Sequence, residues 1–406
     1  MKRIYGLAIL LGLVLVACHP SPDTNVNNPA GGLWLSQAEL NTLGAVPSYV
    51  VTNANKTINN TDGAEIICSN DFNNSQNVLA AGIVAAKNDS AAARTAVRNA
   101  IADVIGSEDS CSDNRQLGIS RKLPGYVWGA DLANLRVVDP TLNNQFSDWI
   151  WYLLNVNDGQ SGCGTTGGDG GPGIIGCHLH RSHNWGTVAG VARVVGNHYI
   201  AVNDPDQAHR ERSVGDVIFR ADRTDAKRVV QGQFDTSVYN GFGDRHADNK
   251  HACVPSTFAS SGEPVNGPGE CPKGSLGLSW DGGIPEDLDR GTRTPGTCTG
   301  TIDGHAWGAG NYATGEIYAL YRFHKTRHED DDANAIRAWA NDGGERVLSF
   351  FNRLSFACGK AGNYPEGDDQ PWPFLVNNLY GTAYPEDSAS ATGKVYSYTD
   401  YMPQMP

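Results

Sequence analysis

The sequence has little positive charge, no close pair of cysteines and, after its first residues, no long apolar run. It contains 31 Lys plus Arg against 44 Asp plus Glu, and the net charge of −13 repels nucleic acid and anionic lipid surfaces at long range. No Cys-x-x-Cys occurs, which disfavours a zinc site built from thiolates. No later segment is apolar enough to span a membrane. We therefore expect neither a nucleic-acid-binding protein nor a membrane-spanning one.

Sustained strand alternation is also scarce, whereas helical periodicity recurs along the chain. With 40% hydrophobic and 18% charged residues, 48 Gly and 20 Pro, the composition indicates a globular, loop-rich protein rather than a disordered chain or a coiled coil. Between residues 90 and 105, Val97, Ile101 and Val104 share one helical face, and Gly106 supplies a stop. The same pattern predicts helices at residues 76–87, 121–135, 145–155, 191–202, 207–223, 317–321 and 336–351. We therefore predict an all-α fold of paired helices joined by Gly-rich loops.

The N-terminal segment resembles that of a bacterial lipoprotein precursor. A short basic start precedes an apolar run, residues 4–16, that is too short to cross a bilayer. The run ends in Leu15-Val16-Ala17-Cys18, which resembles a lipobox, so we expect a lipid anchor at Cys18 as the only membrane contact. His19 is not the Asp that retains lipoproteins in the inner membrane, which favours an outer-membrane lipoprotein facing the periplasm or the cell surface. The expected boundaries are residues 1–18 for the signal peptide, 19–32 for a flexible tether and 33–406 for a single domain.

The remaining eight of the nine cysteines are an even number in an oxidising compartment, which makes disulfides the default expectation. Two long segments, residues 157–182 and 245–279, are Gly-rich and bracketed by cysteines. The first expected pairs are Cys163 with Cys177 and Cys253 with Cys271. Long ordered loops in a compact domain are usually functional, so we expect both segments to serve the site.

Histidines are concentrated in one part of the chain, since seven of the eleven lie between His178 and His251. That part holds 10 Lys plus Arg against 9 Asp plus Glu, so it is nearly neutral while the excess acid lies elsewhere. A zinc site at the densest group lacks an evident carboxylate, which favours acid/base chemistry or polar packing. His178 and His180 are also compatible with plain surface histidines. A donor set suited to a carboxylate and a sugar hydroxyl follows: Arg181, His183 and Asn184, beside Trp185.

Two further groups combine aromatic and polar residues. In the first, which covers residues 280–291 and 303–312, glycines surround His305 and Tyr312 and would let a ligand approach closely, although a core tyrosine is the alternative. The second covers residues 368–382 and resembles a sugar subsite, with aromatic platforms beside Asn and Asp. Aromatic residues that simply tie down the C-terminal segment are the alternative for this second group.

Read in chain order, these motifs resemble the alginate lyase-like polysaccharide lyases, closest to polysaccharide lyase family 38, which includes glucuronan and alginate lyases. The resemblance covers nearly the whole mature chain. It implies an α/α toroid, an incomplete barrel of about six or seven helical hairpins with long disulfide-stapled loops. The motifs that carry it are Asn114-Arg115, Arg121 to Leu132, Asn184-Trp185-Gly186-Thr187, Ile284-Pro285-Glu286-Asp287 with Arg290-Gly291, Asn311-Tyr312, and Pro373 to Thr382 with Gly393-Lys394.

The resemblance also implies β-elimination on a polyuronate, a reaction that needs a neutralised carboxylate, a base for the C5 proton and an acid for O4. We expect Asn184, with His183 or an Arg, to neutralise the carboxylate. Tyr312 is expected to act as the acid, with Arg290 assisting ionisation of its phenol. The base is either Tyr312 itself or one of the alternatives, His183 and His305. The remaining expected substrate contacts are Arg115, Arg121, Arg181, Trp185, Asn311, Trp372, Asn377 and Lys394. No cofactor and no metal are expected, and the partner is an acidic polysaccharide.

The chain departs from the family pattern at one motif. Where the family carries Asn-Asn-Trp-Gly-Thr-His, this sequence has His183-Asn184-Trp185-Gly186-Thr187-Val188, so the identity of the base and the preferred uronate stay open. Two other classes of function also stay open. One is a non-catalytic polysaccharide-binding outer-membrane lipoprotein. The other is a toroidal glycoside hydrolase, which needs two carboxylates about 5 to 10 Å apart from among Asp287, Asp289 and Asp303.

Overall fold

The structure of the protein is a computed structural model. It describes residues 32–68, 73–110, 115–155, 173–180, 184–217, 304–337, 370–386, 393 and 395–405. Secondary structure within these residues is helical, without a strand, which confirms the predicted all-α class. None of the helices in these ranges is both long enough and apolar enough to cross a membrane.

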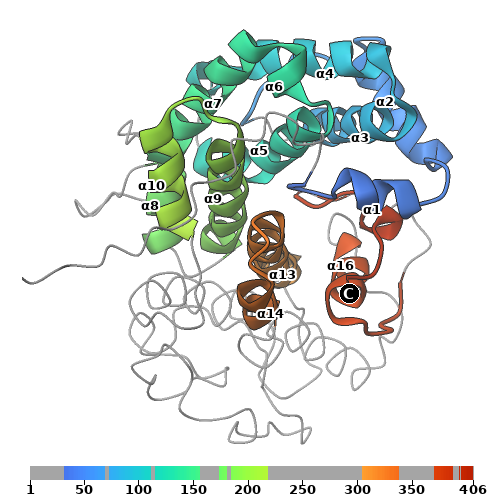
Figure 1. Cartoon of the computed structure of the whole chain (residues 1–406), viewed down its shortest axis with the longest axis vertical. Helices are drawn as coiled ribbons and strands as arrows, with labels where there is room; N and C mark the ends of the chain where they lie inside the picture. Colours follow the sequence, from blue (N-terminus) through green and yellow to red (C-terminus); the bar gives the residue numbers. More distant parts are fainter. Residues whose placement is uncertain are drawn as a thin grey trace, which may run out of the picture.

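The helices form a curved double layer (Figure 1). In one layer, α3, α5, α9 and α13 pack side by side in chain order, and α2, α4, α7 and α10 pack along the outer side of this row. The bounds are α1 Gln37–Thr42, α2 Ser48–Ile58, α3 Asn73–Asn88, α4 Ala91–Val104, η1 Ser107–Ser110, α5 Arg115–Leu132, α6 Leu135–Val138, α7 Pro140–Asn155, α8 Gly173–His180, α9 Asn184–Asn203, α10 Gln207–Val217, α13 Gly304–Thr326, α14 Asp330–Arg337, α16 Pro371–Tyr380 and η4 Thr399–Tyr401.

The α4 helix follows the pattern predicted from its sequence. The Ser90 hydroxyl caps its N-terminus by accepting a hydrogen bond from the Ala93 backbone N–H at 3.3 Å. Val97, Ile101 and Val104 are fully buried on one face. Gly106 has a φ of 83°, a left-handed conformation that favours glycine and follows the end of the helix.

Glycines let α3 and α5 pack unusually close together. A Cβ atom on Gly82 would lie 2.8 Å from the Gly129 Cα, and one on Gly125 would lie 2.6 Å from the Ser75 carbonyl oxygen. A Cβ atom on Gly129 would meet Val78 in the same way. Ser75 contacts Gly125, and the later residue Val78 contacts the later residue Gly129, so α3 and α5 run parallel.

The α9 and α13 helices are also parallel. The carboxyl group of Glu316 packs against Gly190, and further along both helices His198 Nε2 lies 2.7 Å from the Thr326 hydroxyl. Burial of nearly all of α9 agrees with the apolar stripe predicted for residues 191–202. Parallel neighbours place the N-terminal ends of α9 and α13 at the same side of the double layer.

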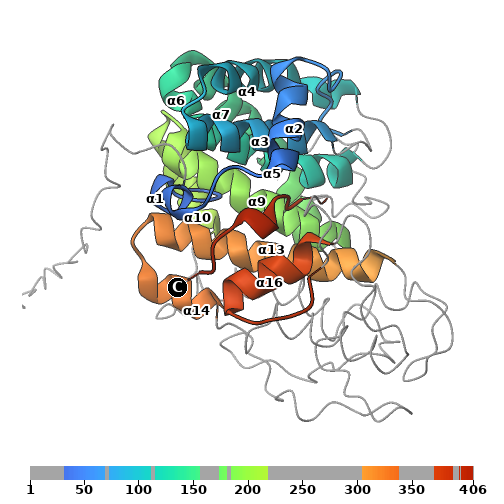
Figure 2. The ribbon, with the colours of Figure 1, turned by 90° about the vertical axis from the view of Figure 1, so that its right-hand side faces the viewer.

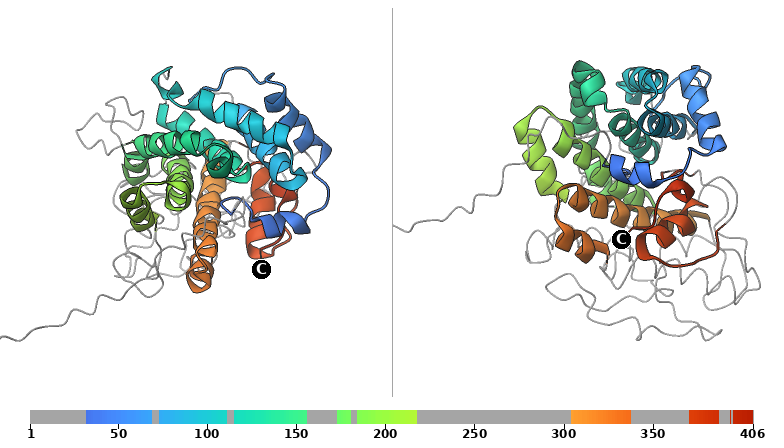
Figure 3. Two further views of the ribbon diagram at one scale, coloured as in Figure 1. Left: turned by 45° about the horizontal axis from the view of Figure 1, so that its top comes forward. Right: turned by 45° about the vertical axis from the view of Figure 1, so that its right-hand side comes forward.

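The last described residues pack against the first helices. Gln76 Nε2 donates to the Gly393 carbonyl oxygen at 2.6 Å, and the Tyr401 hydroxyl donates to the Gly44 carbonyl oxygen at 2.9 Å. Figure 2 shows α16 lying along α13, and Figure 3 shows the C-terminal segment beside the N-terminal helices. These contacts join the two ends of the double layer.

The structure corrects several expected boundaries. The segment 368–382, expected as a sugar-binding segment, contains α16, and the long segment 157–182 contains α8. The helix predicted to start at residue 121 starts at Arg115 and includes Pro124. The predicted helices 207–223 and 336–351 are described only to residues 217 and 337, and segment 245–279 lies outside the described residues.

Each of the two described cysteines, Cys68 and Cys177, takes part in a disulfide bond. Cys163, Cys253 and Cys271 lie outside the described residues, so the two expected pairings stay predictions. Cys18 and the tether lie outside them as well.

Substitution of Gly129 tests the close packing of α3 and α5. The Cβ atom of an alanine there would lie 2.8 Å from Val78 Cγ1 and 2.9 Å from the Val78 carbonyl oxygen, so the helices must separate. We expect Gly129→Ala to lower the free energy of unfolding by about 1 to 3 kcal/mol in urea denaturation. Gly215→Ala in α10 is the matched control, because nothing lies within 4 Å of its Cβ position. Equal stabilities for the two variants would contradict this explanation.

Candidate functional site

The structure describes only part of the predicted site. Asn184, Asn311 and Tyr312 are described with their side chains, and all three are almost completely buried. Arg115 lies in α5 and His305 in α13. Four predicted residues, and the three acidic candidates for a hydrolase, lie outside the described residues: Arg181, His183, Arg290, Lys394, Asp287, Asp289 and Asp303.

The register of α9 and α13 places Asn184 level with Tyr312. Asn184 opens α9, about 9 Å before Gly190 at 1.5 Å per residue. Tyr312 lies one turn, about 6 Å, before Glu316, the residue that contacts Gly190. Because the two helices are parallel, the expected carboxylate-neutralising residue, at the start of α9, and the expected acid, about two turns into α13, lie at a similar height on neighbouring helices.

The phenol of Tyr312 points toward the N-terminal end of α13. A Cβ atom on Gly308 would lie 3.5 Å from the Tyr312 ring and 3.7 Å from its hydroxyl oxygen. Side chains in an α-helix lean toward its N-terminus, so this direction follows from the helix itself. The phenol therefore packs along the surface of α13 beside Gly308, toward the side of the double layer where α9 begins.

A buried polar group that the sequence analysis did not single out lies one turn after Tyr312. Glu316 is 1% exposed, and its Oε1 lies 3.3 Å from His178 Nε2. The other nitrogen of His178, Nδ1, lies 3.5 Å from Arg193 Nη1. Within the described part of the chain, Glu316 Oε2 has no hydrogen-bond partner. Glu316, His178 and Arg193 thus form a polar group between α8, α9 and α13.

Burial makes Glu316 and His178 neutral at pH 7. Burial raises the pKa of Glu316 to about 8, although the Arg193 charge opposes this shift. Burial also lowers the pKa of His178 well below its usual value, and Arg193 lowers it further. The charge of Arg193 is balanced by Asp216, whose carboxylate accepts from Nη2 at 2.5 Å and from Nε at 2.7 Å. The group next to Tyr312 therefore carries little net charge.

His178 is not one of the surface histidines considered from the sequence, since it is only 2% exposed. The sequence signal that could have identified Glu316 is its position four residues after Tyr312, inside an otherwise apolar stripe. A lone carboxyl group in such a stripe is either paired or protonated when it is buried.

Two residues expected to bind substrate, Trp372 and Asn377, are buried and hydrogen-bonded within the protein. Trp372 is fully buried, and its Nε1 donates to the Thr314 hydroxyl at 2.9 Å, so neither ring face is available to a sugar. The Asn377 amide donates to the Tyr384 carbonyl oxygen at 3.0 Å and to Glu386 Oε1 at 2.7 Å, which holds the chain after α16. The described hydrogen bonds of both residues are within the protein, and their assignment to a sugar subsite stays a prediction.

Glycines near Tyr312 contact protein side chains rather than leaving space for a ligand. A Cβ atom on Gly310 would lie 2.3 Å from the Trp372 ring, and one on Gly315 would lie 2.2 Å from the Tyr396 ring. These glycines let aromatic side chains from the C-terminal segment pack against α13. Trp185 and Arg121, by contrast, are half-buried and keep some exposed surface.

No model of a known protein family matches this chain, and no curated protein or solved structure was found to be similar to it.

The raised pKa of Glu316 predicts a pH-dependent loss of stability. The unfolded chain releases this proton near the ordinary pKa of 4.5, whereas the folded protein keeps it up to about pH 8. The contribution of Glu316 to stability is therefore complete below pH 4.5 and is lost as the pH rises through about 8. Glu316→Gln has no such proton, so we expect the wild type to lose about 2 to 5 kcal/mol relative to this variant between about pH 5 and about pH 9.

Urea denaturation across this pH range measures the difference. Glu211→Gln, on the exposed surface of α10, is the control and is expected to follow the wild type. Parallel stability curves for the wild type and Glu316→Gln would show that Glu316 is not protonated in the folded protein.

Proposed function

We propose that the protein is a polysaccharide lyase that cleaves a polyuronate, glucuronan or alginate, by β-elimination and leaves an unsaturated uronate at the new end. The observation that carries the proposal is the placement of Asn184, at the start of α9, at a similar height to Tyr312 on the parallel neighbouring helix α13. The resemblance of the surrounding sequence motifs to those of polysaccharide lyases gives these two residues the roles of carboxylate-neutralising donor and acid in this proposal.

Asn184 has the position and chemistry of a neutralising donor. As the first residue of α9, it lies where the helix dipole places partial positive charge, and its amide N–H can donate to a uronate carboxylate. Withdrawal of charge from that carboxylate makes the C5 proton more acidic. His183 or Arg181, in the preceding residues, adds a further donor in this proposal, and Trp185 a surface for the sugar ring.

Tyr312 supplies the proton for the leaving group. A base removes the C5 proton, the C4–O4 bond breaks as the C4–C5 double bond forms, and the phenol gives its proton to O4. His183, His305 or the Tyr312 phenolate itself serves as the base, with Arg290 favouring ionisation of the phenol. The neutral state of Glu316 supports this assignment, because a buried carboxylate next to Tyr312 would repel a polyanionic substrate.

An α/α toroid is the architecture we propose for the chain. Parallel packing of α3 with α5 and of α9 with α13 supports it, and so do the contacts between the C-terminal segment and the first helices. Such an arrangement gathers the helix N-termini on one face, where Arg115, Arg121, Asn311 and Lys394 would line a cleft. The pairs Cys163 with Cys177 and Cys253 with Cys271 would staple the long loops.

Residues 1–18 are proposed to be removed as a lipoprotein signal peptide, leaving an outer-membrane lipoprotein anchored at Cys18. The tether, residues 19–32, then places the catalytic domain at the membrane surface, facing the periplasm or the exterior. An enzyme held there would meet polysaccharide that enters or surrounds the cell.

Ultraviolet absorbance on glucuronan, alginate and pectate tests the proposed reaction, because only elimination produces a conjugated unsaturated uronate. We expect the wild type to generate this absorbance on at least one of the three, and Tyr312→Phe to generate none while it still binds that polymer. Loss of the phenolic proton donor removes the step at O4 and keeps the ring.

Tyr321→Phe is the matched control, since Tyr321 is buried on the same helix. It is expected to retain activity. Binding without absorbance by the wild type would identify a polysaccharide-binding protein, and new reducing ends without absorbance would identify a hydrolase. Near-normal turnover by Tyr312→Phe would remove Tyr312 from the mechanism.

Asn184→Ala tests carboxylate neutralisation. We expect turnover to fall by about one to three orders of magnitude, as is typical for the loss of one charge-stabilising donor. Asn184→Asp should lose at least as much, because it sets a negative charge against the uronate. Asn203→Ala, also buried but at the opposite end of α9, is the control. An unchanged rate in Asn184→Ala would mean that another group neutralises the carboxylate.

A further inference from the structure

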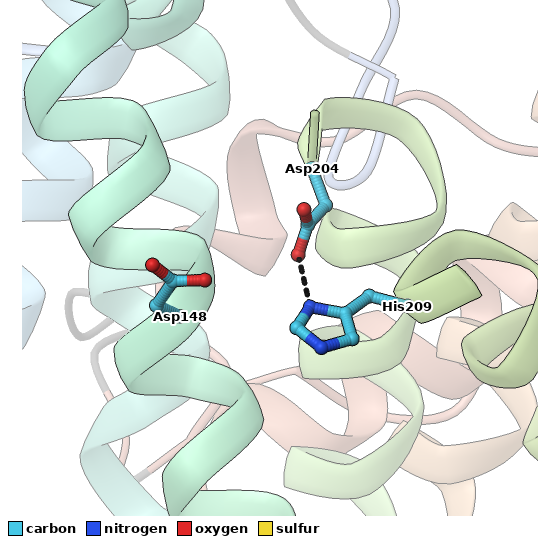
Figure 4. Close-up of side chains that lie close together, drawn as sticks. All are labelled: Asp148, Asp204 and His209. Carbon is cyan, nitrogen blue, oxygen red and sulfur yellow. Dashed lines mark hydrogen bonds and ion pairs between the residues drawn. The ribbon is translucent and has the colours of Figure 1, made fainter. Parts of the chain in front are cut away.

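Three potential metal ligands converge at the C-terminal end of α9. Asp148 comes from α7, Asp204 follows the last residue of α9, and His209 lies in the first turn of α10. Their ligand atoms all lie within 4.8 Å of one another. Figure 4 shows the Asp204 carboxylate and the His209 ring facing each other, with the Asp148 carboxylate directed toward the same space.

Two of these side chains are held in place by the surrounding structure. The Asp204 carboxylate is fully buried, and its Oδ1 accepts from the Asp206 backbone N–H at 2.7 Å, so that Oδ2 faces His209. The His209 ring stacks on Trp151, with centroids 4.4 Å apart and an angle of 11° between the planes. Asp148 is exposed.

Among the described residues, neither a Lys nor an Arg side chain balances the negative charge of this cluster. Within the described part of the chain, no Lys or Arg forms an ion pair with Asp148 or Asp204. Arg210 is close, yet its guanidinium donates to the carbonyl oxygens of Asp204 at 2.6 Å and Pro205 at 3.0 Å. The carboxylates of Asp148 and Asp204 lie close enough to repel each other. A bound cation would relieve this repulsion.

The distance between the two ordered ligands fits a metal ion. His209 Nδ1 lies 3.3 Å from Asp204 Oδ2 and forms a long hydrogen bond with it, which is an ion pair when the imidazole is protonated. A charge-assisted hydrogen bond would be shorter, about 2.7 to 2.9 Å. Two ligands of a tetrahedral zinc ion with bonds of about 2.0 Å lie about 3.3 Å apart, which agrees with the observed separation.

We propose that Asp148, Asp204 and His209 bind one zinc ion, with water in the fourth position. The imidazole favours zinc over calcium or magnesium, which prefer oxygen ligands alone. Asp204 is about 30 Å along α9 from Asn184, at 1.5 Å per residue, so the ion is remote from the proposed elimination site. It connects α7, the end of α9 and the start of α10, and its role is to stabilise this part of the double layer.

Zinc titration of the full-length protein, stripped of metal with a chelator, tests the site. We expect calorimetry to show binding that Asp148→Asn weakens at least about tenfold, because one charged ligand is lost. Zinc should also raise the melting temperature of the wild type more than that of Asp148→Asn. Asp148 is exposed, so the variant is expected to fold.

Asp332→Asn is the matched control, since Asp332 belongs to a second group with His324 and Glu329. It should bind zinc like the wild type. The proposal fails if the wild type binds no zinc, if Asp148→Asn binds as tightly as the wild type, or if only Asp332→Asn loses affinity. If the zinc is held by other histidines of the chain instead, its binding will be unchanged in Asp148→Asn, and this result would contradict the proposal.

Discussion

The contact between Gly190 and the Glu316 carboxyl group is the constraint on which the candidate site depends. A side chain at position 190 would occupy the space of this carboxyl group, since a Cβ atom there would lie 2.4 Å from Glu316 Oε2. The contact sets the register of two parallel helices, and this register brings Asn184 level with Tyr312. The contact also removes the Glu316 carboxyl group from water. Protonation of this carboxyl group, rather than pairing with a positive charge, lowers the free-energy cost of burying it.

The two ends of α9 have different electrostatic character. At its N-terminal end the polar groups near Tyr312 are neutral or internally paired: Glu316 is protonated, His178 is uncharged, and Arg193 is balanced by Asp216. At its C-terminal end the carboxylates of Asp204 and Asp148 and the imidazole of His209 lie within 4.8 Å of one another. A polyanion is tolerated better at the first end and a cation at the second, which agrees with a protein whose overall charge is −13.

Periodicity in the sequence was enough to predict the all-α class and several helices, because apolar residues at helical spacing identify buried faces independently of tertiary context. Val97, Ile101 and Val104 in α4 are an example. The α16 helix was missed because two prolines and a run of aromatic and amide residues also suit a binding segment. Trp372 shows the same ambiguity, since a core tryptophan and a sugar platform have the same neighbours in sequence and differ only in burial.

The site was predictable only where one residue carries the signal by itself. Tyr312 and Asn184 belong to short motifs, whereas Glu316 depends on partners in α8 and α9, more than 120 residues earlier in the chain. Asp148, Asp204 and His209 likewise come from different parts of the chain, and no local sequence spacing predicts that they lie together. Contacts of this kind are decided by the packing of the double layer.

The most direct test of the account is a crystal structure of Tyr312→Phe with a bound oligouronate. We predict a uronate carboxylate within about 2.7 to 3.2 Å of the Asn184 amide nitrogen, and the O4 atom of the scissile bond facing the edge of the ring at position 312. An oligouronate bound elsewhere on the molecule, with Asn184 still buried among protein side chains, would contradict it.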